Sequence, residues 1–232
     1  VLVTHSMGGL VARAYLRGEE GASSGSERAL AGATAAGFAF AAARAIGEIL
    51  VRVANPPDRP GRTVIQILQD DRPFIVDTVR LLLRRAQLRE RLFLHPILPI
   101  RRDVAGVLLR VDTAPATPRE SALYVEVSPR IDDPAHLADL EASLRDAMEK
   151  VRDVTEDHAR MLAAVAESYA GVDHAGRMLP GGAMRARRVR SFLEWRVAEH
   201  VVLLGLRRYA LRSLDGGAGF EVGLVPGTGL GL

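Results

Sequence analysis

Residues 63–83, TVIQILQDDRPFIVDTVRLLL, hold a strand pattern that runs directly into a helix pattern. A strand is predicted over Arg62–Gln69, because β-branched and aliphatic residues follow the turn-prone segment NPPDRPG. Asp70 and Asp71 come next, where a helix N-cap is expected, and Pro73 suits a first helical turn. This stretch therefore predicts a β-strand joined to an α-helix by a very short connection.

Two amphipathic helices are predicted around the central part of the chain. Over residues 74–86 the apolar side chains recur at three- and four-residue spacing, which indicates one buried stripe: Phe74, Ile75, Val79, Leu82 and Leu83. Residues 133–154 give the stronger helix pattern, with Asp133 as the N-cap and Pro134 at the first helical position. Its apolar face is predicted to hold Leu137, Leu140, Leu144, Met148 and Val151.

Further strands are predicted between these helices. They cover residues 91–100, 105–113 and 121–128, the first two being joined by RRDVAG. The order strand, helix, strands, helix predicts an α+β fold. We expect an antiparallel sheet of ACT-like or ferredoxin-like kind, with helices packed on one face.

Composition divides the chain into four regions. Residues 1–27 form an atypical N-terminal segment and linker, residues 28–50 an Ala-rich helical lead-in, and residues 51–180 the ACT-like domain. Residues 181–232 are predicted to be the start of a second, truncated α+β module. That module should contain a basic helix over 185–200, strands over 201–211 and 220–225, and a Gly-rich turn or linker, PGTGLGL.

The residue composition excludes several kinds of chemistry. The 232 residues include no cysteine, which excludes disulfides, thiolate catalysis and Cys-based zinc sites. Lys150 is the single lysine, so Schiff-base and P-loop lysines have almost no candidate. The histidines are scattered singly, and no metal site is predicted. No uncharged apolar run reaches the length of a membrane span, and we expect a cytoplasmic protein that binds no membrane.

Two motifs favour other functions. The segment THSMGG around Ser6 resembles the nucleophile elbow of α/β-hydrolases, although Thr4 replaces the first glycine of that motif. A serine esterase or lipase fragment that uses Ser6 is therefore the alternative hypothesis. The basic run Arg185–Arg190 could contact phosphates, but a solvated helix face explains it better, and no nucleic-acid partner is predicted.

Several segments together resemble the N-terminal, non-catalytic region of the large bacterial NAD-specific glutamate dehydrogenases. They are VRVANPP, TVIQILQDDRPFIVDTVRLLL, LHPILPIRRDVAG, ESALYVEVSPRIDD, LEASLRDAMEKVRDVTEDHARMLAAV, FLEWRVAEHVVLLGLRRYAL and VPGTGLGL. The resemblance covers about residues 28–232. It implies ACT-type regulatory modules ahead of a distant core that deaminates glutamate oxidatively with NAD. It assigns no catalytic, cofactor-binding or metal-binding residue to this chain.

These inferences lead to one functional expectation. The chain should act as a regulatory and structural segment that contacts the remainder of the same polypeptide and takes part in a homo-oligomer. An amino-acid effector could bind at the strand-to-helix junction near Asp70, Asp71 and Pro73, where helix N–H groups would face its carboxylate. Helix capping by the two aspartates is the simpler interpretation of the same residues.

Overall fold

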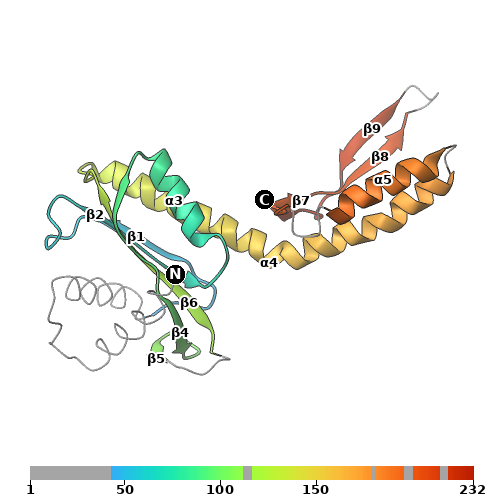
Figure 1. Cartoon of the computed structure of the whole chain (residues 1–232). Coiled ribbons are helices and arrows are strands. Elements are labelled where there is room, and N and C mark those ends of the chain that lie inside the picture. The colour runs from blue at the N-terminus through green and yellow to red at the C-terminus, as the bar shows by residue number, and fades with distance from the viewer. Residues whose placement is uncertain (1–42, 112–116, 179–180, 196–200, 215–218) are drawn as a thin grey trace. The chain divides into compact units, whose positions relative to one another are not determined.

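The computed structural model describes residues 43–111, 117–178, 181–195, 201–214 and 219–232. The chain divides into two compact units, residues 1–149 and residues 150–232. Figure 1 shows the elements of both units, and one long helix, α4 (Pro134–Met178), contributes residues to each. Residues 1–27 and most of the predicted helical lead-in lie outside the described residues. The described end of that lead-in, residues 43–49, forms a β-bridge and a turn and contains no helix.

The first unit is built on an antiparallel sheet with the strand order β1-β2-β6-β4-β5, in which β3 also pairs with β6. Its strands are β1 (Leu50–Ala54), β2 (Thr63–Asp70), β3 (Arg89–Leu94), β4 (Ile97–Arg102), β5 (Leu108–Val111) and β6 (Arg119–Ser128). Strand β6 is central. It pairs with the whole of β2 along one edge and with β3 and then β4 along the other.

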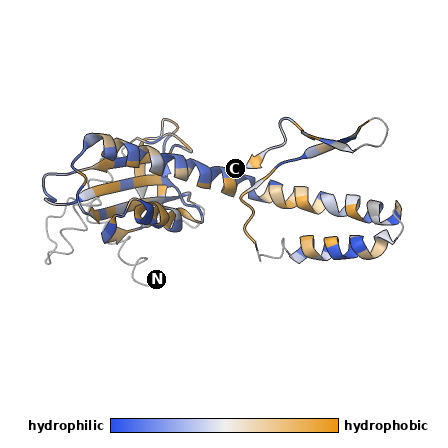
Figure 2. Cartoon of the chain, turned by 90° about the horizontal axis from the view of Figure 1, so that it is seen from above, coloured by the Kyte–Doolittle hydropathy of each residue, from blue (hydrophilic) through white to orange (hydrophobic). Residues whose placement is uncertain are grey.

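Both faces of β2 are covered, because all of its residues except Asp70 are buried. Side chains alternate between the faces of a strand. Gln69 donates to the Met148 sulfur at 3.1 Å, which places one face of β2 against helix α4. Val64, on the opposite face, packs with Tyr124 and with the partly buried Leu92 and Leu94. Hydrophobic residues accordingly run through the strands of this sheet (Figure 2).

Helix α4 begins as predicted. Asp133 Oδ1 accepts a hydrogen bond from the Ala135 N–H at 2.9 Å, and Pro134 is the first helical residue. Leu140, Leu144, Met148 and Val151 are buried, and Leu137 is half-buried. The predicted apolar face is therefore confirmed. The helix then continues well beyond residue 154, to Met178.

Helix α3 (Ile75–Arg85) confirms the predicted helix, but its start differs from the prediction. The N-cap is Phe74, with a left-handed φ of 70° and no side-chain capping bond. Pro73 precedes the helix in a turn. The predicted capping by Asp70 and Asp71 is therefore wrong, since β2 extends through Asp70 and the helix begins only at Ile75, after Phe74. Phe74 is 43% exposed and is not part of the buried stripe, which consists of Ile75, Val79 and Leu83.

The single strand predicted over residues 91–100 is divided into β3 and β4 at His95 and Pro96. The pairing register is unchanged across the break, because Leu94 lies opposite Tyr124 and Ile97 lies opposite Ser121. Proline has no N–H group to donate to the ladder. Its carbonyl still accepts from the Ala122 N–H at 3.0 Å. Strands β3 and β4 therefore follow one continuous path along β6. The break between them reflects the backbone hydrogen-bond donor that Pro96 lacks.

The second unit contains the C-terminal part of α4, helix α5 and two small sheets. The elements are α5 (Gly182–Trp195), β7 (Gly205–Leu206), β8 (Tyr209–Ser213), β9 (Phe220–Leu224) and β10 (Leu230–Gly231). The strand predicted over 201–211 is broken into β7 and β8, and the basic helix begins earlier than predicted. The Gly-rich end is not only a turn or linker, because β10 pairs with β7. Leu203 packs with Val154 and Met161 in the core of this unit.

We predict that Gly106→Ala destabilises the first unit far more than Gly61→Ala. Both glycines have a positive φ, so both substitutions strain the backbone by about 1 kcal/mol. A Cβ atom at Gly106 would also lie 2.2 Å from the Arg44 carbonyl oxygen, whereas one at Gly61 would meet nothing within 4 Å. Denaturant unfolding measures both free energies. Equal losses for the two variants would show that residue 106 does not pack against residue 44.

Candidate functional site

The end of β2 carries a cluster of ion pairs. Asp70 Oδ1 lies 2.5 Å from Arg44 Nη2, and Asp70 Oδ2 lies 3.4 Å from Arg72 Nη2. The carboxylate predicted to help bind an effector is therefore already paired with two guanidinium groups. Its place in this cluster explains why it is not available for capping α3.

The cluster continues to a buried glutamate on the neighbouring strand. Glu120 Oε1 lies 2.9 Å from Arg44 Nη1 and 2.7 Å from Arg102 Nε, and its second oxygen accepts from Arg102 Nη2 at 2.9 Å. The side chains of Arg44, Glu120 and Arg102 are 3%, 5% and 7% exposed. Removing one partner from such a buried arrangement would leave an uncompensated charge. This cluster joins the segment before β1 to β4 and β6.

Asp71 and Pro73 complete the predicted effector site. The Asp71 N–H donates to the Arg119 carbonyl at 2.9 Å, and Pro73 is exposed. The first turn of α3 carries Asp77, whose negative charge disfavours an anion at that helix terminus. The ion pairs of Asp70 and the backbone hydrogen bond of Asp71 favour a structural junction at these residues.

His95 lies beside this junction, at the break between β3 and β4. Its Nε2 atom is 2.6 Å from Ser121 Oγ on the central strand. Burial lowers the pKa of His95 below its ordinary value, and the negative charge of Asp71 opposes that shift in part. The folded protein therefore favours the neutral imidazole.

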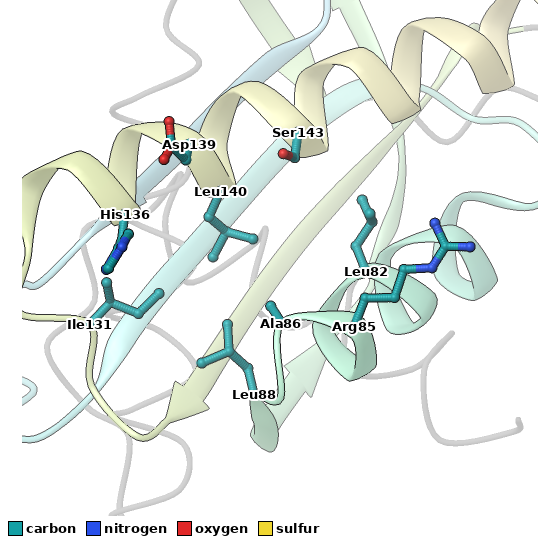
Figure 3. Close-up of a pocket in the computed structure, with 9 residues that line it drawn as sticks. All are labelled: Leu82, Arg85, Ala86, Leu88, Ile131, His136, Asp139, Leu140 and Ser143. Atoms are coloured by element: carbon teal, nitrogen blue, oxygen red, sulfur yellow. The ribbon is translucent and has the colours of Figure 1, made fainter.

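A groove between the end of α3 and the start of α4 is a candidate ligand site among the described residues. It encloses about 460 Å³. Figure 3 shows the residues that line it, namely Leu82, Arg85, Ala86, Leu88, Ile131, His136, Asp139, Leu140 and Ser143. The volume is within the range of small-molecule sites.

The groove combines an apolar floor with charged groups on opposite sides. Leu88 and Leu140 are buried and form part of the floor. Arg85 comes from α3, while His136 and Asp139 come from the first turns of α4 (Figure 3). Apolar residues with charged groups at the edges of the groove suit a small ligand that has both polar and apolar parts. Sequence periodicity placed these residues on helices but could not show that the two helix ends meet.

The remaining sequence motifs contribute little to a site in the described residues. Ser6 and its hydrolase-like motif lie outside them. Within the basic run, Arg190 pairs with Asp173 at 2.6 Å and with Glu194 at 2.8 Å. The described segments contain no group of three or more acidic or histidine side chains arranged for a metal ion. None of the helices in these segments has the length and apolar character needed to cross a membrane.

Comparisons with known proteins agree on one family. Residues 13–144 match the family described as the glutamate dehydrogenase ACT1 domain. The NAD-specific glutamate dehydrogenase of Halomonas elongata is 31% identical over 177 residues, which cover 72% of this chain and 11% of that relative. The enzyme of the same name from Pseudomonas aeruginosa is 29% identical over 177 residues, with the same coverage. That of Mycobacterium tuberculosis is 28% identical over 182 residues, covering 75% of this chain and 11% of the relative.

We predict that Glu120→Gln lowers the free energy of unfolding by about 3–5 kcal/mol, because it leaves two buried guanidinium groups without their shared carboxylate. Glu90→Gln is the matched control. Glu90 pairs with Arg80 at 3.1 Å near the surface, so its loss should cost less than about 1 kcal/mol. Chemical denaturation of both variants provides the comparison. Similar small losses would mean that the buried cluster contributes little.

We also predict that the protein loses stability as the pH falls below about 6.5, the ordinary pKa of histidine. His95 takes up a proton at that pH in the unfolded chain, but only at a lower pH in the folded chain. Protons therefore favour unfolding between the two pKa values, and stability rises with pH through this window. The exposed His158 is the control. Thermal unfolding against pH should become flatter in His95→Gln but not in His158→Gln.

Proposed function

This chain belongs to the glutamate dehydrogenase ACT1 domain family, and from that premise we propose that it is a regulatory and structural segment of a large NAD-specific glutamate dehydrogenase. The family match over residues 13–144 is the observation that carries the proposal. An antiparallel sheet with helices packed on it is consistent with such a module. We further propose a cytoplasmic location and a homo-oligomeric assembly in which the segment contacts the rest of its polypeptide.

The chain spans 11% of the length of the relatives that it matches. For the whole protein we propose oxidative deamination of glutamate to 2-oxoglutarate and ammonia, with NAD as the hydride acceptor. The glycine-rich segment 226–231 does not fit NAD. The glycine-rich segment after β9 leads into β10, so it lacks the helix N-terminus that holds a pyrophosphate in dinucleotide-binding folds. In this proposal the cofactor and the catalytic residues belong to a different part of the enzyme.

The regulatory role, in this proposal, depends on an amino acid bound in the groove between α3 and α4. Arg85 would hold the carboxylate, Asp139 would hold the ammonium group, and Leu88 and Leu140 would contact the side chain. The groove is favoured over the junction at Asp70, because Arg44 and Arg72 already neutralise that carboxylate. A ligand that contacts both helices would stabilise the folded unit.

We expect isothermal titration calorimetry of the chain with a panel of amino acids to find binding by a member that has an apolar side chain. Arg85→Gln and Asp139→Asn should each weaken that binding at least about tenfold, because each removes one charged contact. Arg84→Gln and Asp146→Asn are exposed controls on the same two helices, outside the groove.

Two results would contradict the effector site. One is the absence of any heat of binding at millimolar amino acid. The other is binding that the groove and control variants weaken equally. Neither result would affect the family membership of the chain, which rests on sequence.

A further inference from the structure

The β8–β9 hairpin presents a row of large apolar side chains to solvent. The strands pair antiparallel, with Tyr209 opposite Leu224 and Leu211 opposite Val222. Residues directly opposite each other project from the same face, and so do alternate residues along a strand. The four side chains therefore share one face. Each of them is largely exposed: 58% for Tyr209, 54% for Leu224, 69% for Leu211 and 62% for Val222.

The other face of the hairpin has a different character. It carries Arg212 opposite Glu221 and Ala210 opposite Gly223. The charges of the two strands are thus confined to this face, and they are opposite in sign. The apolar face has no charged group to attract a nucleic acid or another polyanion. Its chemistry suits a second apolar protein surface.

The base of the hairpin is anchored within its own unit (Figure 1). Arg208, immediately before β8, donates to Glu167 of α4 at 2.6 Å. The Val225 N–H, immediately after β9, donates to the Arg208 carbonyl at 3.0 Å. Leu206 and Leu230 pack against the core formed by Val154, Met161 and Leu203. The hairpin is therefore held at its base while its apolar face stays uncovered by the described residues.

Two-stranded hairpins are marginal in water unless a further strand or helix packs on them. In the described residues β8 and β9 pair only with each other. An apolar face of this kind normally marks an interaction site. The chain corresponds to only 11% of its relatives' length, so a protein of their size has ample polypeptide to cover it.

We propose that the apolar face of the β8–β9 hairpin is the docking surface for an apolar helix or sheet face supplied by the same polypeptide, from outside residues 1–232. The proposal rests on the part of the proposed function that makes this chain a segment of a longer enzyme. It does not depend on the effector groove. The docked element covers Tyr209, Leu211, Val222 and Leu224 and leaves Arg212 and Glu221 in solvent.

The test compares tyrosine nitration at Tyr209 in the 232-residue chain and in the natural full-length protein, read by peptide mass spectrometry. The intact mass of the natural protein is measured first, and a mass near that of this chain would refute the longer enzyme itself. In a longer protein, docking should slow nitration of Tyr209 at least about tenfold relative to the 232-residue chain. Equal rates in the two proteins would overturn the docking proposal alone.

Variants on the two faces of β8 provide a matched control. Leu211→Ser should restore rapid nitration of Tyr209 in the full-length protein, because it weakens the docked interface. Arg212→Ser, its neighbour on the opposite face, should leave Tyr209 protected. Both variants of the 232-residue chain should unfold at the temperature of the unmodified chain, since residues 211 and 212 are exposed. Protection that rises with the concentration of the 232-residue chain would instead identify a second copy as the occupant and overturn the proposal.

Discussion

The pairing of β6 between β2 and the β3–β4 path is the constraint on which the rest of the first unit depends. A late strand of the unit inserts between two earlier ones and hydrogen bonds along both of its edges. This insertion brings Glu120 beside the ends of β2 and β4, where Arg44 and Arg102 meet it. The chain leaves β6 and enters α4, whose first turns lie along the same groove as the end of α3. The buried cluster and the candidate effector groove both follow from one strand placement.

The two pairs of adjacent aspartates show what sequence can and cannot predict. Asp132–Asp133 and Asp70–Asp71 both precede a proline and an amphipathic helix, so local rules predict a cap at each. Asp133 does cap α4, since its Oδ1 atom accepts from the Ala135 N–H and its Oδ2 atom lies 3.5 Å from His136 of the same helix. Asp70 instead pairs with Arg44, which is distant in sequence and reaches it only through the folded sheet. Local patterns thus predicted strand β2 and both helices, whereas the cluster and the groove required tertiary contacts.

The second unit shows the same limit in another form. The apolar run over residues 201–211 predicts one strand, but the chain divides it between β7, which pairs with β10, and β8, which pairs with β9. Gly205 allows this arrangement, since a Cβ atom there would lie 2.3 Å from the Leu232 carbonyl oxygen. The spacing of apolar residues along the sequence indicates which residues can be buried, but it does not identify the element against which each one packs. Leu203 packs against α4, whereas Leu211 lies opposite Val222 in the hairpin and stays 69% exposed.

Helix α4 has a consequence for how this protein can be divided or inherited. Its first half supplies Leu144 and Met148 to one unit, and its continuation supplies Val154 and Met161 to the other. The boundary between the units, at Glu149 and Lys150, therefore falls inside an unbroken helix and not in a linker. A gene fusion or truncation at that point would leave each unit its own core side chains, but it would cut the helix and remove the backbone hydrogen bonds that cross the boundary. We therefore expect recombination to transfer the two units together, because a crossover at their boundary would interrupt α4.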